Sequence, residues 1–170
     1  MKSMIIYSSR TGNTKAVAEA IREVFPEPCT LAPVEEAPDI SDVDFLAIGY
    51  WVDKGQPDAK AKAFMKTVKG KKVGLFGTLG AYPDSEHAND CRAAAEALME
   101  GNDVLGQFVC QGKIDPKVLE MMAKVAADRH PMTEERKARI EEAKKHPNEA
   151  DFTNARDLFS GIVETLQKGA

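Results

Sequence analysis

The stretch that decides the fold is residues 4–14, MIIYSSRTGNT. Residues 4–7 form a continuous apolar run, which is typical of a parallel strand covered on both faces. Apolar residues then recur at helical spacing from Ala16 to Val24, so the polar residues 9–14 join a buried strand to a helix. Such a loop lies at the carboxyl end of its strand, where open α/β sheets bind their ligands.

The same alternation of strand and helix continues as far as residue 110. Apolar runs predict further strands at four ranges: 29–31, 45–50, 73–77 and 104–110. Helical stripes of apolar residues separate these runs, and Pro57 stands at the first position of one predicted helix. This alternation predicts an α/β fold, with an open five-stranded parallel sheet and helices on both of its faces.

The chain departs from this alternation after the last predicted strand. Residues 113–150 are rich in charge. They contain a short apolar stripe, Val118, Leu119 and Met122, followed at residues 133–145 by a segment with few apolar positions, which predicts a helical insertion with no second core. From Phe152 to Leu166 apolar residues return at helical spacing, so this segment is expected to be the last helix of the sandwich. We therefore expect a single domain over residues 1–170, with the insertion at about 113–150.

Length and composition narrow the possible functions. With 170 residues, 43% hydrophobic and 29% charged, the chain has the composition of one globular domain rather than of a disordered segment. A formal charge of −4 disfavours nucleic acid as a partner. No apolar run approaches the ~18 residues of a membrane span. The three cysteines form no CxxC or zinc pattern, so we expect no metal site and a reduced, cytoplasmic protein.

The loop after the first strand has the composition of an anion-binding site. A helix N-terminus offers free backbone amides and the positive end of the helix dipole. Gly12 permits a tight backbone turn, and serine and threonine hydroxyls add further donors. These features predict a phosphate site formed by Ser9, Arg10, Thr11, Gly12, Asn13 and Thr14. A capped turn without a ligand is the alternative explanation for the same residues.

Two further loops follow the third and fourth predicted strands, at the same edge of the sheet. Trp51, the only tryptophan, follows residues 45–50 and offers a flat platform for a planar ligand. The loop after residues 73–77 contains Gly80, which permits close backbone approach, and Tyr82, which offers a second ring. Each loop alone has an ordinary explanation, but all three are expected at the carboxyl ends of neighbouring strands.

Other phosphate-binding and catalytic patterns are absent from the sequence. No GxxxxGK[ST] run is present and no GxGxxG follows the first strand, which disfavours nucleoside triphosphatases and dinucleotide-binding proteins. The histidines His87, His130 and His146 are scattered, and no Ser/His/Asp spacing stands out. We therefore predict no independent catalytic residue.

The pattern Ser9-x-Thr11-Gly12-x-Thr14 after an apolar strand resembles the phosphate loop of the flavodoxin family. The resemblance covers roughly residues 2–110 and the final helix. It implies a flavodoxin-like three-layer sandwich with strand order 2-1-3-4-5, and FMN as the cofactor. It also implies that Trp51 and Tyr82 flank the isoalloxazine ring, and that the ring loops comprise Tyr50, Trp51, Val52, Asp53, Gly55, Thr78, Leu79, Gly80, Ala81, Tyr82 and Asp84.

The sequence departs from the flavodoxin pattern at two positions. Val52 rather than glycine follows Trp51, which leaves open whether the peptide that flips toward the ring lies at Gly55 or near it. Arg10 stands inside the phosphate loop, where flavodoxins often have an uncharged residue, and either contacts the phosphate or faces a partner.

The resemblance implies an FMN-binding electron-transfer protein that shuttles electrons between cytoplasmic oxidoreductases. Flavin or iron–sulfur oxidoreductases are the expected partners, and an acidic rim of Asp53, Asp84, Glu86 and Asp90 would favour basic ones. One alternative is an FMN-dependent NAD(P)H:quinone-type reductase with its own substrate. Another is a non-redox module that binds a partner. We expect a monomer or weak dimer, with neither nucleic acid nor membrane as a partner.

Overall fold

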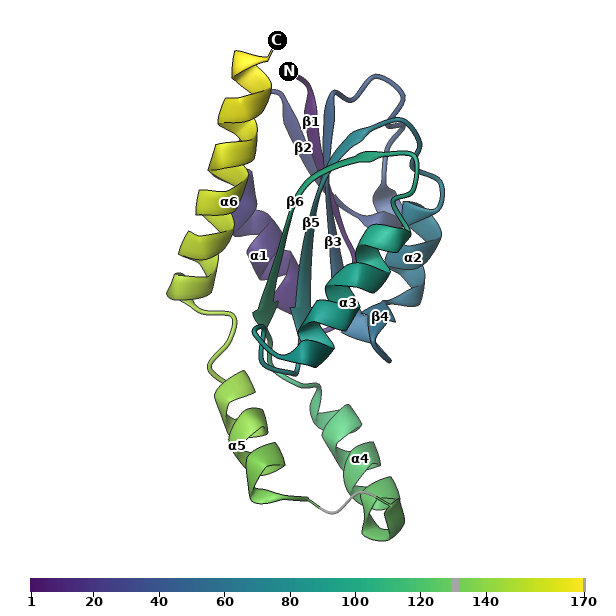
Figure 1. Cartoon of the computed structure of the whole chain (residues 1–170), viewed down its shortest axis with the longest axis vertical. Helices are drawn as coiled ribbons and strands as arrows, with labels where there is room; N and C mark the ends of the chain where they lie inside the picture. Colours follow the sequence, from purple (N-terminus) through teal and green to yellow (C-terminus); the bar gives the residue numbers. More distant parts are fainter. Residues whose placement is uncertain (130–131, 170) are drawn as a thin grey trace.

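The computed structural model describes residues 1–129 and 132–169. Five strands form a parallel sheet in the order β2-β1-β3-β5-β6 (Figure 1). Their bounds are β1 Ser3–Tyr7, β2 Cys29–Pro33, β3 Phe45–Asp53, β5 Lys72–Leu79 and β6 Asp103–Gln111. Numbered among themselves, these strands have the predicted order 2-1-3-4-5. A sixth, two-residue strand, β4 (Gln56–Pro57), pairs antiparallel with the end of β3.

Helices cover both faces of the sheet. One face packs against α1 (Asn13–Arg22) and α6 (Glu149–Lys168), and the other packs against α2 (Ala59–Met65) and α3 (Glu86–Ala97). Strand β1 is continuously apolar because successive residues face opposite sides of the sheet. Ile5 packs in the core with α1 and α6, and Ile6 packs in the core with α2 and α3. The α/β sandwich expected from the sequence is therefore confirmed.

Several predicted element boundaries are wrong by a few residues. Strand β3 continues through Trp51 to Asp53 instead of ending at Tyr50, because β4 folds back and pairs with it. Pro57 belongs to β4 rather than to a helix, and α2 begins at Ala59 after the N-cap Asp58. Strand β5 also extends beyond residue 77, to Leu79.

After β6, two helices extend beyond the carboxyl edge of the sheet: α4 (Pro116–Arg129) and α5 (Glu134–Ala143) (Figure 1). In α5 the buried residue is Ala143, and in α4 the large apolar side chains of Met121 and Val125 are exposed. His130, one of the three scattered histidines, lies outside the described residues. Across residues 1–129 and 132–169, no helix is long and apolar enough to cross a membrane.

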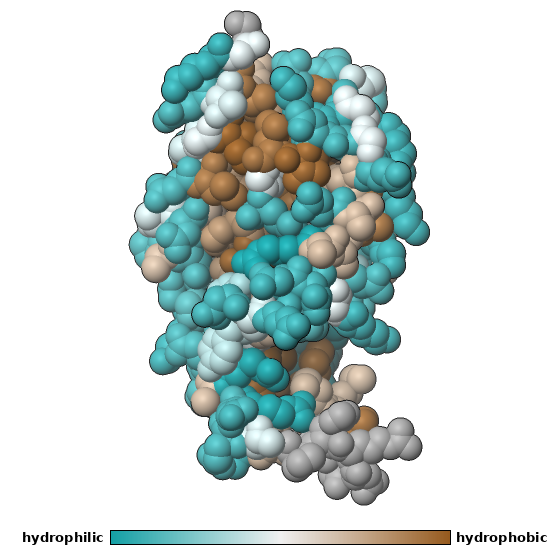
Figure 2. Space-filling model, viewed as in Figure 1, coloured by the Kyte–Doolittle hydropathy of each residue, from teal (hydrophilic) through white to brown (hydrophobic). Residues whose placement is uncertain are grey.

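The opposite, amino edge of the sheet has a shallow hollow. It lies among Met1, Val43, Asp44, Gly70, Lys71, Lys72, Leu166 and Gly169. Apolar side chains also gather on the surface beside α6 (Figure 2), where β6 and α6 contribute the partly buried residues Leu105, Phe108, Leu158 and Leu166. The predicted binding loops lie at the other edge of the sheet, where parallel α/β sheets bind ligands, and we place the candidate site there.

Candidate functional site

The loop between β1 and α1 is folded as a tight turn around one serine hydroxyl. Gly12 has a φ of +95° and is the N-cap of α1, and Asn13 is the first helical residue. The Oγ atom of Ser9 accepts hydrogen bonds from the amides of Gly12, at 3.2 Å, and Lys15, at 3.3 Å. A side chain at Gly12 would meet no atom within 4 Å, so the space beside the turn is open.

This geometry fits a phosphate group. The first amides of an α-helix have no partner within the helix, and they point out of its N-terminus with the positive end of the dipole. Thr11 is exposed beside them, and the hydroxyl proton of Ser9 remains available for donation. The loop therefore places hydroxyl groups beside the N-terminus of α1, and the two together suit a bound oxyanion.

Thr14 has a different position from the other loop hydroxyls. Its side chain is buried, and its Oγ1 lies 2.9 Å from Oγ1 of Thr78 and 3.5 Å from the carbonyl oxygen of Tyr50. Thr14 therefore ties the start of α1 to β3 and β5. These are the two strands that lead into the predicted ring loops, so one hydroxyl holds the three parts of the site in register.

Trp51 lies within β3 rather than in a loop beyond it. It pairs with Thr78 of β5, and its side chain is partly exposed at the carboxyl edge of the sheet. The guanidinium of Arg10 lies over the indole, 5.7 Å from the ring centroid. After Val52 and Asp53 the chain turns at Lys54 and Gly55, both with positive φ, and returns as β4.

A buried carboxylate beneath these loops escaped the sequence analysis. Asp58 is 1% exposed and accepts hydrogen bonds from the Ser8 hydroxyl at 2.7 Å and the Trp51 amide at 3.2 Å. It also caps α2 by accepting from the amides of Lys60 and Ala61. The sequence holds a signal for this cap, because an aspartate precedes the helical stripe, but Pro57 beside it also favours a helix start.

The loop between β5 and α3 places a second aromatic ring at the same edge. Thr78 and Leu79 are buried at the end of β5, Gly80 and Ala81 are partly buried, and Tyr82 is 39% exposed. Ser85 stabilises the turn by donating its hydroxyl to the carbonyl of Tyr82 and by capping α3. Asp84 and His87 are exposed, and the His87 ring lies beside Gly55.

Burial makes the cysteines poor nucleophiles. All three are unpaired and buried. Burial raises the pKa of the Cys29 thiol to about 11 and also raises the pKa of Cys91 and Cys110. In the described part of the chain, no group of three or more His, Cys, Asp or Glu side chains comes together to hold a metal ion.

The structure brings the three predicted loops together at one edge. The hydrogen bonds of Thr14 link them, and a partly exposed Trp51 and an exposed Tyr82 supply two aromatic rings there. Asn13 is directed elsewhere, because its side-chain amide donates to the carbonyl of Lys113 at 2.9 Å. A mononucleotide with a flat ring fits this combination of free amides, an open turn and aromatic side chains.

Comparison with known proteins identifies the family. The flavodoxin domain model matches residues 4–160. The flavodoxin-like domain-containing protein BilS of Clostridioides difficile is 34% identical over 164 residues, which cover 91% of this chain and 92% of that protein. BilS of Clostridium symbiosum is 35% identical over 139 residues, covering 71% and 73% respectively. These matches support a flavin cofactor.

Solved structures agree on the fold. A flavodoxin from the domain Archaea aligns over 98% of this chain and 99% of its own, with a TM-score of 0.59 and 16% identity. A flavoprotein from Lactobacillus acidophilus, solved in complex with FMN, aligns over 72% of this chain and 98% of its own, with a TM-score of 0.53 and 17% identity. At these identities the likeness concerns the fold alone.

Proposed function

The chain belongs to the flavodoxin family, and we propose that it is an FMN-binding electron carrier that serves partner oxidoreductases in the cytoplasm. The observation that best supports this proposal is the convergence of three loops at one sheet edge, tied together by the Thr14 hydroxyl. The FMN bound by the L. acidophilus flavoprotein, which shares the fold, adds to that support.

In this proposal the phosphate of FMN binds at residues 9–14. The amides at the start of α1 and the hydroxyls of Ser9 and Thr11 donate to it, and Gly12 leaves room for it. Charge-assisted hydrogen bonds of this kind contribute about 1.5–3 kcal/mol each. The loop therefore anchors the cofactor without a dedicated lysine.

Trp51 and Tyr82 exclude water from the flavin ring in this proposal. FMN supplies the electron chemistry, and the protein supplies binding, orientation and local charge. Asp53, Asp84 and Glu86 belong to the loops around the proposed ring position or lie next to them. Their negative charge opposes the added charge of a reduced flavin and therefore lowers its reduction potential.

The same acidic residues form the surface that we propose for a basic redox partner. Electrostatic attraction would speed association, and the rate would fall as ionic strength rises. The protein would act as a monomer or weak dimer. An independent reductase would instead consume NAD(P)H in the absence of a partner.

Absorption spectroscopy tests the proposal. After incubation with FMN and removal of the excess, the protein should be yellow, and Trp51 emission should be quenched because the ring lies against the indole. A Trp51→Phe variant provides the matched control for that emission. A protein that stays colourless would overturn the proposal, and steady NAD(P)H oxidation by the purified chain would favour the reductase instead.

A further inference from the structure

The last residue of β6 and the segment that follows it, together residues 111–115 and here called the connecting segment, contact the proposed phosphate loop at three points. The side-chain amide of Asn13 donates to the carbonyl of Lys113 at 2.9 Å. The Nε of Arg10 lies 3.2 Å from a carboxylate oxygen of Asp115, with which it forms an ion pair. Gly112 packs closely against Asn13. A Cβ added at Gly112 would lie 2.6 Å from the side-chain amide nitrogen of Asn13. This connecting segment therefore holds two residues of the phosphate loop in place.

The same segment contacts the second ring loop and helix α5. The buried side chain of Gln111 donates to the carbonyl of Gly80 at 3.0 Å and to the carbonyl of Arg139 at 3.2 Å. Ile114 lies against Gly80, where an added Cβ would be 3.0 Å from its side chain. The connecting segment thus joins the phosphate loop and the loop after β5 to the helices α4 and α5.

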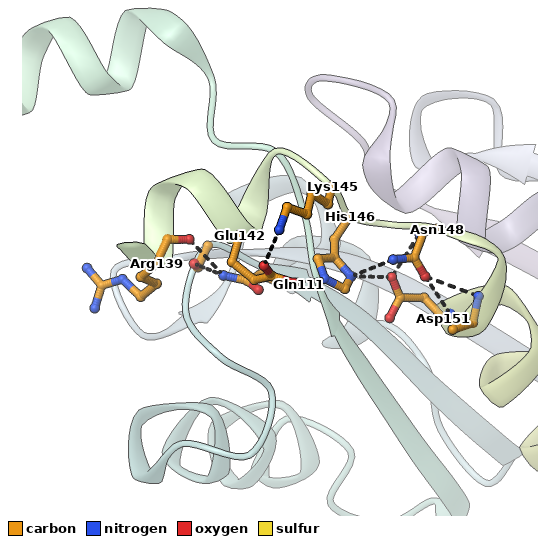
Figure 3. Close-up of polar contacts among 9 residues, drawn as sticks. Gln111, Arg139, Glu142, Lys145, His146, Asn148 and Asp151 are labelled. Carbon is orange, nitrogen blue, oxygen red and sulfur yellow. Dashed lines mark hydrogen bonds and ion pairs between the residues drawn. The ribbon is translucent and has the colours of Figure 1, made fainter. Parts of the chain in front are cut away.

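At its other side the connecting segment is bound to His146, between α5 and α6. The amide of Lys113 donates to the carbonyl of His146 at 3.1 Å. The imidazole lies between two carboxylates (Figure 3), with Nδ1 2.6 Å from Asp151 and Nε2 3.1 Å from Glu142. Because an ionised carboxylate only accepts hydrogen bonds, the imidazole can bond to both carboxylates at once only as the charged imidazolium, in which both ring nitrogens donate.

We propose that protonated His146 is a positioning residue for the flavin site. By joining the end of α5 to the first turn of α6, it holds the connecting segment against the phosphate loop, so FMN binds more tightly to the protonated form. The inference rests on the proposed function, because it concerns the same site. It assigns the residues that follow β6 to the support of that site.

Charged groups around His146 favour its protonated state. Burial alone lowers the pKa of His146, but the hydrogen bonds and charges of Asp151 and Glu142 outweigh it, so its pKa lies above the usual value. Lys145, just beyond the end of α5, pairs with Glu142, which keeps the pKa of that carboxyl low. Cys110 of β6 interacts with Asp151, but burial raises the pKa of its thiol out of the range in which His146 titrates.

The direction of the pH effect follows from this shift. Because the folded pKa exceeds the ordinary one, the stabilising contribution of His146 is complete below the ordinary histidine pKa of about 6.5 and is lost as pH rises through the raised value. In the proposal the protonated form also binds FMN more tightly, so FMN affinity should fall over the same interval. The phosphate of FMN also titrates, near about pH 6, so affinity must be compared between variants at each pH.

The experiment measures FMN affinity by quenching of flavin fluorescence, from about pH 6 to about pH 9, for the wild type and His146→Gln. We expect the wild type to bind about fivefold more tightly than the variant at low pH. This ratio lies at the low end of the couplings measured between sites in proteins. The two affinities should converge at high pH. A ratio that does not change with pH overturns the inference while leaving the proposed function intact.

Two further measurements separate positioning from a loss of folding. Glu142→Gln should weaken FMN binding at low pH, whereas Glu141→Gln, one residue away on α5 and paired with Lys144, should not. In NMR titrations the pKa of His146 should rise by about 0.7 on FMN binding, because coupling is reciprocal. An equal pKa in both forms overturns the inference. Absence of FMN binding at every pH overturns the proposed function as well.

Discussion

In the sandwich, α6 buries Phe159 and Ala155 completely against the sheet, whereas α4 leaves Met121 66% exposed and Val125 63% exposed. Both helices are amphipathic by sequence, so the pattern alone does not decide which face is covered. The difference lies in the neighbours, because the sheet supplies an apolar surface for α6, and α4 extends beyond its edge (Figure 1). The sandwich is held by its cores, and the α4–α5 pair is joined to it by polar contacts at its base.

The largest contrast is expected between large apolar residues of the two regions. Phe159→Ala removes a ring that packs against Phe25 and Phe76, each with a centroid distance of 6.1 Å. It should lower the free energy of unfolding by about 3–5 kcal/mol. Met121→Ala, on the exposed face of α4, should change it by less than about 0.5 kcal/mol. Urea denaturation followed by circular dichroism measures both, and similar losses would contradict the comparison.

A buried polar residue of the sandwich should matter nearly as much as a core ring. Asp58→Ala leaves the Ser8 hydroxyl and the Trp51 amide without their acceptor and removes the cap of α2. Together these losses should cost about 2–4 kcal/mol of unfolding free energy. Asp39→Ala, at an exposed turn, is the matched control and should have little effect. Equal effects of the two substitutions would refute the structural role of Asp58.

The phosphate loop should respond in ligand affinity more than in stability. Thr11→Ala combined with Thr14→Ala should weaken FMN binding at least about tenfold, or about 1.4 kcal/mol. Thr11 acts as an exposed donor, and Thr14 holds β3 and β5 in register. Isothermal calorimetry measures the affinity, and Thr67→Ala, whose hydroxyl only donates to the carbonyl of Phe64, is the control. Unchanged affinity in the double variant would remove the phosphate assignment.

Much of the sandwich could be predicted because its signals are local. The continuous apolar run at residues 4–7 and the helical stripes between strands follow from burial on one or two faces. Burial favours apolar residue types, so it can be recognised in the sequence. The position of Trp51 could not be predicted in this way. It depends on the pairing of β3 with β4, which forms only because Lys54 and Gly55 take a turn with positive φ.

The contacts of the connecting segment were also beyond the reach of sequence patterns. Asn13 and Lys113 are separated by 100 positions, and no periodicity relates them. Arg10 shows the same limit, since the sequence placed it in the phosphate loop but did not reveal that Asp115 would face it. Non-local polar contacts depend on tertiary geometry, which the spacing of residue types does not encode.

The smallest expected effect concerns the ion pair that joins the two regions. Arg10 and Asp115 are 47% and 17% exposed, so water screens their attraction only in part. A double-mutant cycle of Arg10→Ala and Asp115→Ala should give a coupling of about 0.2–1 kcal/mol in unfolding free energy. Arg10→Ala should also change Trp51 emission, because the guanidinium lies over the indole.

The cycle of Lys2 and Asp42, an exposed pair within the sandwich, is the control. A zero coupling together with unchanged emission would show that Arg10 does not hold the connecting segment to the site, and would leave Asn13 and Gln111 as the contacts that do.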